Sequence, residues 1–542
     1  MTSHGAHKIA LALPASPRKL RPTVVEGGEM TGENRDQWTV TEPLIAGDER
    51  AETGEWRDAD IEEIRSVGQF MREAAAENRR LWALAGPAIF TSVAQYSLGG
   101  ITQIFAGHLT TLDLDAVSVQ NMVIGGLAFG IMWGMGSALE TLCGQAFGAK
   151  QFHMLGVYMQ RSWVILLTTC IFILPIYIFA TPILRLFGED EAIAVHAGRF
   201  SLYMIPQLFM YALNFPIQKF LQSQSKVMAM SYISAGAVLL HILLSWILIV
   251  WLGLGLVGAS ISLNVSWWFV VIAQFVYIAM GSCPGAWNGF SRRAFKDLVE
   301  FTRLSIASAV MLCLECWNLM FLIVMVGLLK NAQIAVAAIS ICINLHGWEI
   351  MIFVGFNAAI SVRVSNELGA RRPRAAKFSV LIVTLTAGLV GLIFFTTVMA
   401  LRKVYAIPFT NNPEVVRAVA HLILVFAFTL LSDSVGPVLA GVAVGAGWQA
   451  LVAYINLGCY YVVGIPLGYL LAFKLDLGVE GMWGGALVGV ALQALILGVI
   501  TLRTNWEKEA MEAESRVSKW GGSADSTCNS SKVDHSASVS AA

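Results

Sequence analysis

Long segments without a charged residue constrain this chain more than any other feature of its sequence. Residues 227–291 contain no Asp, Glu, Lys or Arg. A helix of about 20 apolar residues is enough to cross the hydrocarbon core of a bilayer. The 542 residues are 56% hydrophobic and only 13% charged, whereas soluble domains average roughly 25% charged residues. Further uncharged segments cover 81–112, 116–139, 162–184, 200–218, 378–401, 434–473 and 481–502. We therefore predict a polytopic membrane protein.

Twelve membrane helices account for these segments. Residues 227–291 are long enough for two helices, which the glycine-rich turn Gly253–Gly258 separates. Three more spans contain one interior acid each, namely Glu315, Glu349 and Asp433. We expect helices near 82–107, 116–140, 157–181, 197–220, 228–251, 257–281, 301–328, 335–363, 377–401, 415–440, 449–473 and 479–502. The predicted fold class is an all-α polytopic membrane protein.

The sequence gives no support to several other classes of protein. Lys and Arg balance Asp and Glu at 36 each and form no basic stripe, so no nucleic-acid partner is expected. Gly253–Gly258 matches Gly-x-Gly-x-x-Gly, but the strand, helix and acid of a dinucleotide fold are missing around it. No phosphate-binding P-loop and no His-Glu-x-x-His occur. Cys313 and Cys316 have no second pair nearby, so we expect neither a metal nor a cofactor.

The loops predict the orientation and the domains. Lys and Arg are more frequent after the even-numbered spans, which places both termini in the cytoplasm. We divide the chain into a mostly disordered cytoplasmic tail (1–80), an N-terminal six-helix lobe (81–285), a C-terminal six-helix lobe (286–502) and a Ser-rich, disordered cytoplasmic tail (503–542). Glu42–Ile45 is similar to a dileucine-type sorting signal, although its spacing departs from that pattern. The vacuolar membrane is favoured, with the plasma membrane as the alternative.

The second half of the chain repeats the first at an offset near 221 residues. Gly148–Lys150 corresponds to Gly369–Arg371, and Pro216 corresponds to Pro437. An even number of helices separates the copies, so we expect the two lobes to be related by a pseudo-two-fold axis along the membrane normal. Such frames are typical of secondary transporters, whose substrate site lies between the lobes. Duplication without transport stays open as the alternative.

Two membrane acids are not repeated. Glu315 in span 7 corresponds to Gln95 in span 1, and Asp433 in span 10 corresponds to Ala212 in span 4. An ionised carboxylate inside a membrane helix costs about 2.5–3.5 kcal/mol, and a buried carboxyl can keep its proton up to near-neutral pH. We interpret Glu315 and Asp433 as proton-coupling residues, with structural hydrogen bonding as the alternative. The role of Glu349 stays open, and we expect no interior His beside the span acids.

Other polar and aromatic residues in the spans are candidates for a substrate cavity. An amide in a membrane helix more often bonds to a neighbouring helix, and an aromatic ring often only packs, so each has a structural alternative. The candidates are Gln95, Asn121, Asn214, Trp317, Asn318, Asn344, Asn357, Tyr454, Asn456 and Tyr461.

Four motifs resemble the multidrug and toxic compound extrusion (MATE) family in its plant form. Glu140–Lys150 is similar to that family's loop after span 2, and Val362–Ala370 is similar to the partner loop after span 8. Cys313–Trp317 and Gly441–Gln449 resemble its span 7 and the turn before span 11. The resemblance covers about residues 82–502. It implies two six-helix lobes around a central cavity and export of organic solutes in exchange for H+ or Na+, with plant members driven by protons.

The resemblance also bears on single residues. The family's acidic pair in spans 7 and 10 maps onto Glu315 and Asp433. Many relatives have a Gln and an Arg where this chain has Gly436 and Val444, so a substrate preference does not carry over. Gln95 stands where prokaryotic members have an acid, which argues against an ion site in the N-terminal lobe.

The sequence therefore predicts a proton-coupled antiporter that works as a monomer in the lipid bilayer, with the proton gradient as its energy source. The family resemblance implies that its cargo is a small organic solute, such as a flavonoid, an alkaloid, a xenobiotic or an organic acid, exported from the cytosol by alternating access. One alternative is a channel-like pathway for chloride or nitrate, although no interior ring of Arg or Lys supports it. A membrane-embedded enzyme is the other alternative, but the spans lack a paired nucleophile and base, so we do not expect an enzyme.

Overall fold

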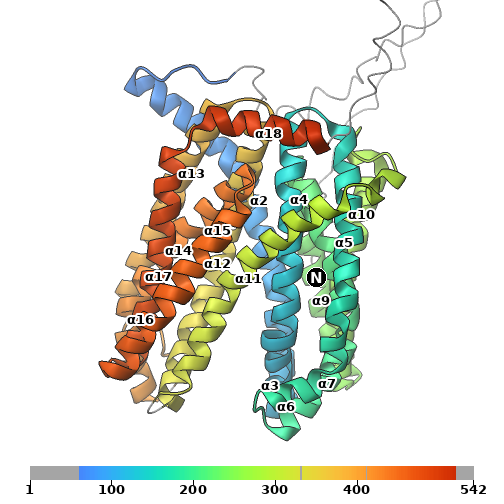
Figure 1. The fold of residues 1–542 in the computed structure, drawn as a ribbon. Helices are drawn as coiled ribbons and strands as arrows, with labels where there is room; N and C mark the ends of the chain where they lie inside the picture. The colour runs from blue at the N-terminus through green and yellow to red at the C-terminus, as the bar shows by residue number, and fades with distance from the viewer. Residues whose placement is uncertain (1–59, 330–331, 411, 521–542) are drawn as a thin grey trace, which may run out of the picture. The chain divides into compact units, whose positions relative to one another are not determined.

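The computed structural model describes residues 60–329, 332–410 and 412–520 (Figure 1). The sorting-signal-like segment Glu42–Ile45 and the Ser-rich segment after 520 lie outside the described residues. The described residues form helices and contain no strand. All described helices belong to one compact unit, Thr53–Ala542.

Each of the twelve predicted spans coincides with one helix or with consecutive helical segments. They are α2 (Val67–Gly107); α3 (Thr111–Val119), η1 (Gln120–Gly125) and α4 (Gly126–Gly148); α5 (Phe152–Ile178); α7 (Glu191–Tyr203) and α8 (Ile205–Ser223); α9 (Val227–Ser245) and η2 (Trp246–Trp251); α10 (Gly255–Tyr277) and η3 (Ile278–Ser282); α11 (Leu298–Val326); α12 (Ala332–Gly369); α13 (Pro373–Leu401); α14 (Pro413–Ala446); α15 (Gln449–Asn456), η5 (Leu457–Gly464), α16 (Ile465–Tyr469) and η6 (Leu470–Lys474); and α17 (Gly478–Arg503). The short α6 (Ala180–Leu186) and η4 (Arg292–Phe295) lie in connections. Within the described ranges, ten spans are long and apolar enough to cross a membrane by length and composition alone. The other two, α2 and α7–α8, contain more polar side chains.

Local signals explain several helix ends. Asn412 caps α14 by accepting a hydrogen bond from the Glu414 N–H, and Pro413 follows in the first turn, where its missing N–H costs nothing. Gly447 ends α14 with φ 88°, a left-handed conformation that glycine adopts without strain. Gly253 has φ 63°, and the turn it forms between η2 and α10 agrees with the interpretation of the glycine motif as a tight turn.

The sequence repeat reappears in the packing of α4 against α12. A Cβ added to Gly148, the last residue of α4, would overlap the backbone oxygen of Asn366 on α12. A Cβ added to Gly369, the last residue of α12, would overlap the backbone oxygen of Gln145 on α4. Each helix end therefore needs its glycine to approach the backbone of the other. The two repeat-related motifs are in direct contact.

The C-terminal tail contains a helix that uncharged segments cannot reveal. α18 (Trp506–Trp520) lies against α4, α12 and α13 (Figure 1). Its buried residues Trp506, Ala510, Ala513 and Val517 recur every three or four positions, which is the pattern of an amphipathic helix. Charged residues fill the opposite face, so the segment has no apolar run. The expectation of a disordered tail over 503–542 is therefore wrong for 506–520.

Candidate functional site

Three titratable side chains meet between α12 and α14. His346 and Glu349 are three residues apart on α12, so they lie on one face of the helix. Asp433 reaches the same place from α14, four residues before Pro437. The His346 Nδ1 atom lies 3.4 Å from Glu349 Oε2 and 3.6 Å from Asp433 Oδ2. We call His346, Glu349 and Asp433 the acid–histidine cluster.

The acid–histidine cluster is buried and short of hydrogen bonds. The side chain of Glu349 is 0% exposed, that of Asp433 is 13% exposed, and that of His346 is 14% exposed. Neither Glu349 oxygen, nor His346 Nδ1, has a hydrogen-bond partner among the described residues. Buried charges without donors are costly, so a proton or a cation is needed to stabilise this arrangement.

The two acids that the sequence predicts as a pair lie within electrostatic range of each other. Glu315 comes from α11 and is half-buried, and its charge interacts with that of Asp433. The Tyr460 ring from η5 is buried beside both acids. Carboxyls from α11, α12 and α14 therefore converge inside the C-terminal lobe.

His346 is the residue that sequence reasoning missed. The expectation that no interior His lies beside the span acids is wrong, because His346 contacts both Glu349 and Asp433. A signal was present in the sequence: His346 precedes Glu349 by three residues, which is helical spacing. The contact with Asp433 joins residues far apart in the chain and could not be read from spacing.

The same cluster contains the only candidate ligand set for a metal ion within the part of the chain that the structure describes. His346, Glu349 and Asp433 offer one ligand atom each, and these atoms lie within 4.8 Å of one another. Two carboxylates and an imidazole are a donor set that divalent transition metals accept. Neither a metal nor a cofactor was expected from the sequence.

The equivalent region of the N-terminal lobe is polar but uncharged. Gln95 Oε1 accepts a hydrogen bond from Gln218 Nε2 at 3.1 Å, and Gln95 Nε2 donates to Ser234 Oγ at 3.4 Å. The buried His241 contacts two hydroxyl groups, Thr102 Oγ1 at 3.0 Å and Ser266 Oγ at 3.1 Å.

Several predicted cavity residues link helices instead of facing a common space. Asn357 donates to the Pro437 carbonyl at 2.7 Å, which joins α12 to the proline turn of α14. Asn456 is buried, donates to the Met311 carbonyl at 3.2 Å and accepts from Gln493 at 3.0 Å. These amides follow the structural alternative that the sequence left open.

The remaining candidates are scattered. The Tyr461 hydroxyl donates to the Leu314 carbonyl at 3.1 Å. Tyr454 is 75% exposed on the outside of α15, and Asn344 is also exposed. Asn214 is buried with no hydrogen-bond partner among the described residues. Asn121 and Asn318 are half-buried.

A cavity of about 650 Å³ lies between α4, α5 and α11. Its lining is apolar and includes Met135, Ile306 and Trp317. Trp317 lies in the wall of this cavity, and the other nine candidates do not line it. The cavity suits an apolar or aromatic molecule.

The motif end of the bundle, formed by residues 140–150, 362–374 and 441–449, is tightly closed. Gln449 Nε2 donates to Thr141 Oγ1 at 2.7 Å, and Gln145 Nε2 donates to the Gly445 carbonyl at 3.1 Å. Glu140 pairs with Lys219 at 2.6 Å and forms a buried ion pair. The resembling motifs therefore hold α4 against α14.

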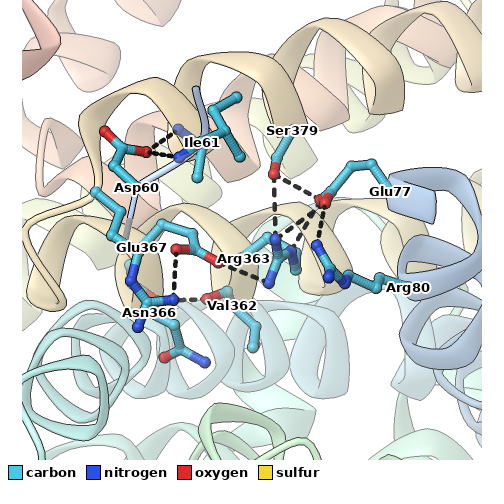
Figure 2. Close-up of polar contacts among 12 residues, drawn as sticks. Asp60, Ile61, Glu77, Arg80, Val362, Arg363, Asn366, Glu367 and Ser379 are labelled. Atoms are coloured by element: carbon cyan, nitrogen blue, oxygen red, sulfur yellow. Dashed lines mark hydrogen bonds and ion pairs between the residues drawn. The ribbon is translucent and has the colours of Figure 1, made fainter. Parts of the chain in front are cut away.

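A second polar cluster at the same end joins α2 to α12 and α13 (Figure 2). Arg363 Nε and Nη2 donate to the two Glu77 oxygens at 3.0 and 3.1 Å. Ser379 Oγ donates to Glu77 Oε1 at 2.6 Å, and Glu367 pairs with Arg363 Nη1 at 2.9 Å. Glu77 and Arg363 are 5% and 10% exposed at their side chains. A bidentate, buried pair of this kind is among the strong interactions in proteins.

The pKa of Glu77, which precedes the first predicted span, reports this pairing. Burial raises the pKa, but attraction by Arg363 and hydrogen bonds from Ser379 and Arg363 outweigh burial. The pKa of Glu77 therefore lies below its usual value. The ionised pair is the stable form at neutral pH.

The comparison with protein families agrees with the internal repeat. The family model described as MatE matches this chain twice, at residues 87–247 and 307–470. The second match begins 220 residues after the first. The two matches thus cover corresponding parts of the two six-helix halves.

Similar proteins come from plants and bacteria. The chain is 58% identical over 453 residues to Protein DETOXIFICATION 33 of Arabidopsis thaliana, covering 84% of this chain and 94% of that protein. It is 55% identical over 463 residues to Protein DETOXIFICATION 30 of the same plant, covering 85% and 93%. The crystal structure of the eukaryotic MATE transporter AtDTX14 is 35% identical, with a TM-score of 0.78 over 83% of this chain and 99% of that chain. The Vibrio cholerae MATE transporter VcmN, in its bent form, is 17% identical with a TM-score of 0.69 over 83% and 99%, which shows a common fold.

Proposed function

Because this chain belongs to the MATE family of membrane transporters, we propose that it is a proton-coupled antiporter that exports organic solutes from the cytosol by alternating access. Membership assigns it the twelve-helix, two-lobe fold and a role in efflux transport. The observation that carries the proton coupling is the convergence of Glu315, Glu349 and Asp433 inside one lobe. The matching region of the other lobe offers neutral side chains.

Proton binding supplies the switch in this mechanism. A proton on Asp433 or Glu315 removes a buried charge and turns an acceptor oxygen into a donor. Hydrogen bonding between α11, α12 and α14 then changes, and with it the wall of the C-terminal lobe. Proton and solute each favour one of two conformations, and this difference couples their movements.

The closed motif end fits one state of such a cycle. By the positive-inside rule, we assign this end to the cytoplasm. Its interlobe contacts, above all Glu77 with Arg363, then hold the cytoplasmic side shut while the other side releases solute. The cycle requires these contacts to break when the cytoplasmic side opens.

The proposed cargo is aromatic or amphipathic, as in flavonoids, alkaloids and xenobiotics, with organic acids as a further class. The apolar cavity beside Trp317 supports the aromatic classes. We favour the vacuolar membrane as its location, the plasma membrane being the alternative.

Buried basic residues do not favour the anion pathway. In the described ranges, Arg161, Lys219, Arg363 and Arg372 are buried, and each pairs with a carboxylate. No described cation of this group is left to attract a permeating anion.

Uptake into reconstituted vesicles tests the proposal. A screen of flavonoid glycosides, alkaloids and organic acids under an imposed pH gradient identifies a transported solute. We expect Glu315→Gln and Asp433→Asn to lose at least about tenfold of its gradient-driven accumulation. Accumulation at the wild-type level in both variants would refute the coupling assignment.

A further inference from the structure

The connection between the two lobes lies at the motif end of the bundle. Residues 283–297 join η3 to α11, and Figure 1 shows them at the same end as α18. α18 contacts both the motif end and the start of α11: Arg516 Nη1 donates to Gln145 Oε1 at 3.2 Å, and Lys519 pairs with Glu300 at 3.0 Å. This is the end that we assign to the cytoplasm.

The connection and the first turns of α11 present a group of exposed cations. Their two acids, Asp297 and Glu300, are already paired with Arg161 and Lys519. Four basic side chains are exposed and form no ion pair with a described residue, namely Arg292, Arg293, Lys296 and Arg303. These four side chains, which we call the basic group, are therefore available to an anionic ligand.

Polar contacts hold the connection against α5. Gln160 Nε2 donates to the Gly289 carbonyl at 3.0 Å, and the Ser291 N–H donates to Gln160 Oε1 at 2.8 Å. Arg161 pairs with Asp297 at 3.2 Å. The basic group thus has a fixed place beside the end of α5.

Exposed apolar side chains accompany the basic group. Phe290 and Phe295 are exposed in the connection, and Val299 is exposed in the first turn of α11. Basic and large apolar side chains that occur together at the end of membrane helices are typical of segments at the membrane interface. We therefore expect the connection to contact lipid headgroups.

The apolar cavity between α4, α5 and α11 begins beside the basic group. Thr302 lines the cavity and directly precedes Arg303. Ile306 and Val310 follow at intervals of four residues on the same face of α11, and both line the cavity and are exposed. Phe172 of α5 lines it from the other side and is exposed as well. The cavity is therefore open toward the bilayer and extends inward from the level of Arg303.

We infer that this place binds a phospholipid with an anionic headgroup: the basic group contacts the headgroup, and one acyl chain lies in the cavity between α5 and α11. Basic residues near a membrane surface attract anionic lipids, and the apolar lining suits a hydrocarbon chain. The lipid would contact α5 of the N-terminal lobe and α11 of the C-terminal lobe together. It and the aromatic cargo proposed above are alternative occupants of one cavity, and the inference does not depend on proton coupling.

Lipid binding to the purified full-length protein in detergent tests this inference without cargo or gradient. Native mass spectrometry measures how much dioleoyl phosphatidylserine and dioleoyl phosphatidylcholine stay bound from an equal mixture. We expect wild type to prefer the anionic lipid. The variant Arg292→Gln/Arg293→Gln/Lys296→Gln/Arg303→Gln should lose at least about tenfold of that preference, because four attractive charges are removed. An unchanged preference in this variant would overturn the inference.

A matched variant separates a site from general attraction by positive charge. Arg72→Gln/Arg79→Gln/Arg374→Gln/Lys377→Gln removes four exposed charges from α2 and α13 and should keep the wild-type preference. A loss of equal size in this control would contradict the inference.

Two threonine variants test the place of the acyl chain. Thr168 of α5 lines the cavity, is exposed and donates to the Val164 carbonyl at 2.7 Å. Thr396 of α13 is exposed and donates to the Leu392 carbonyl at 2.9 Å in the same way. Thr168→Trp fills the cavity and should lower bound phosphatidylserine at least about fourfold, the equivalent of one buried methylene group, whereas Thr396→Trp should not. Equal binding by the two variants would contradict a chain in the cavity.

The headgroup alone separates a lipid site from a site for a free anion. Glycerophosphoserine, which has no acyl chains, should leave phosphatidylserine bound when it is added in excess. Complete displacement of the lipid would show that the anion suffices, and the inference would fail. Neither result bears on the Glu315 and Asp433 experiment, which measures transport.

Discussion

Among the residues that the structure describes, each lobe has an interior histidine that contacts polar side chains, and the two sets of contacts differ in chemistry. In the N-terminal lobe, His241 bonds to Thr102 and Ser266, two neutral hydroxyls. In the C-terminal lobe, His346 lies between Glu349 and Asp433, two carboxyls. The carboxyls that meet a histidine thus lie in the C-terminal lobe, whereas Glu140 in the N-terminal lobe is paired with Lys219. In the proposed mechanism, the C-terminal lobe is the one that binds the proton.

The contact between the lobes should give the largest stability effect. Arg363→Met removes the bidentate partner of the buried Glu77 and leaves it the longer 3.5 Å pair with Arg80, and breaking a buried pair costs about 3–5 kcal/mol. We expect a large drop in the thermal unfolding temperature of the purified protein. Arg65→Met is the control, because Arg65 is 82% exposed and pairs with an exposed Glu63. Equal unfolding temperatures for Arg363→Met and the control would contradict an interlobe role for the pair.

The N-terminal histidine should affect stability without affecting coupling. His241→Leu removes one hydrogen-bond partner from each of two buried hydroxyls, which keep their bonds to the Leu98 and Ser262 carbonyls, and should cost about 0.5–1.5 kcal/mol per bond. The unfolding temperature should fall, while the pH profile of transport stays that of the wild type. A displaced pH profile in His241→Leu would show that the N-terminal lobe also takes part in proton coupling and would contradict this account.

Acid should weaken the interlobe contact. The pKa of Glu77 is lowered in the folded protein, so its stabilisation is complete above the unfolded value of about 4.3 and is lost as the pH falls through the lower folded value. We expect the stability difference between wild type and Glu77→Gln to be largest near pH 7 and to shrink below pH ~4. Thermal unfolding at both pH values measures it. A difference that grows on acidification would contradict the pairing.

Substitutions at two neighbouring residues of the C-terminal lobe should change the free energy of unfolding least. The change at the buried residue should exceed the change at the exposed one. Asn456→Ala removes two buried hydrogen bonds and should cost about 1–3 kcal/mol. Tyr454→Ala alters a ring that is 75% exposed and should stay within about 0.5 kcal/mol. Unfolding temperatures of both variants test this order, and the reverse order would show that the buried bridge to Met311 and Gln493 is unimportant.

The span positions, the repeat and the acids in the C-terminal lobe could be predicted from the sequence, because each leaves a local trace. Uncharged segments reveal membrane helices, and a fixed offset reveals duplication. Uncharged segments do not reveal α18, because its apolar residues are spaced along one face of the helix and charged residues lie between them. The His346 contact with Asp433 and the Glu77 contact with Arg363 join residues far apart in the chain, so only the packed helices reveal them. For the amides, the sequence could not separate cavity lining from helix bridging, because both uses place a polar side chain on an interior face.

Substrate-evoked proton flux tests the central claim most directly. Vesicles containing the protein and a pH-sensitive dye are given the solute that wild type transports best, and the change in internal pH is recorded. We predict a proton flux for wild type and for His241→Gln, and none for Glu315→Gln/Asp433→Asn in protein that still binds the solute. An undiminished flux in that double variant would contradict the assignment of proton coupling to the C-terminal lobe.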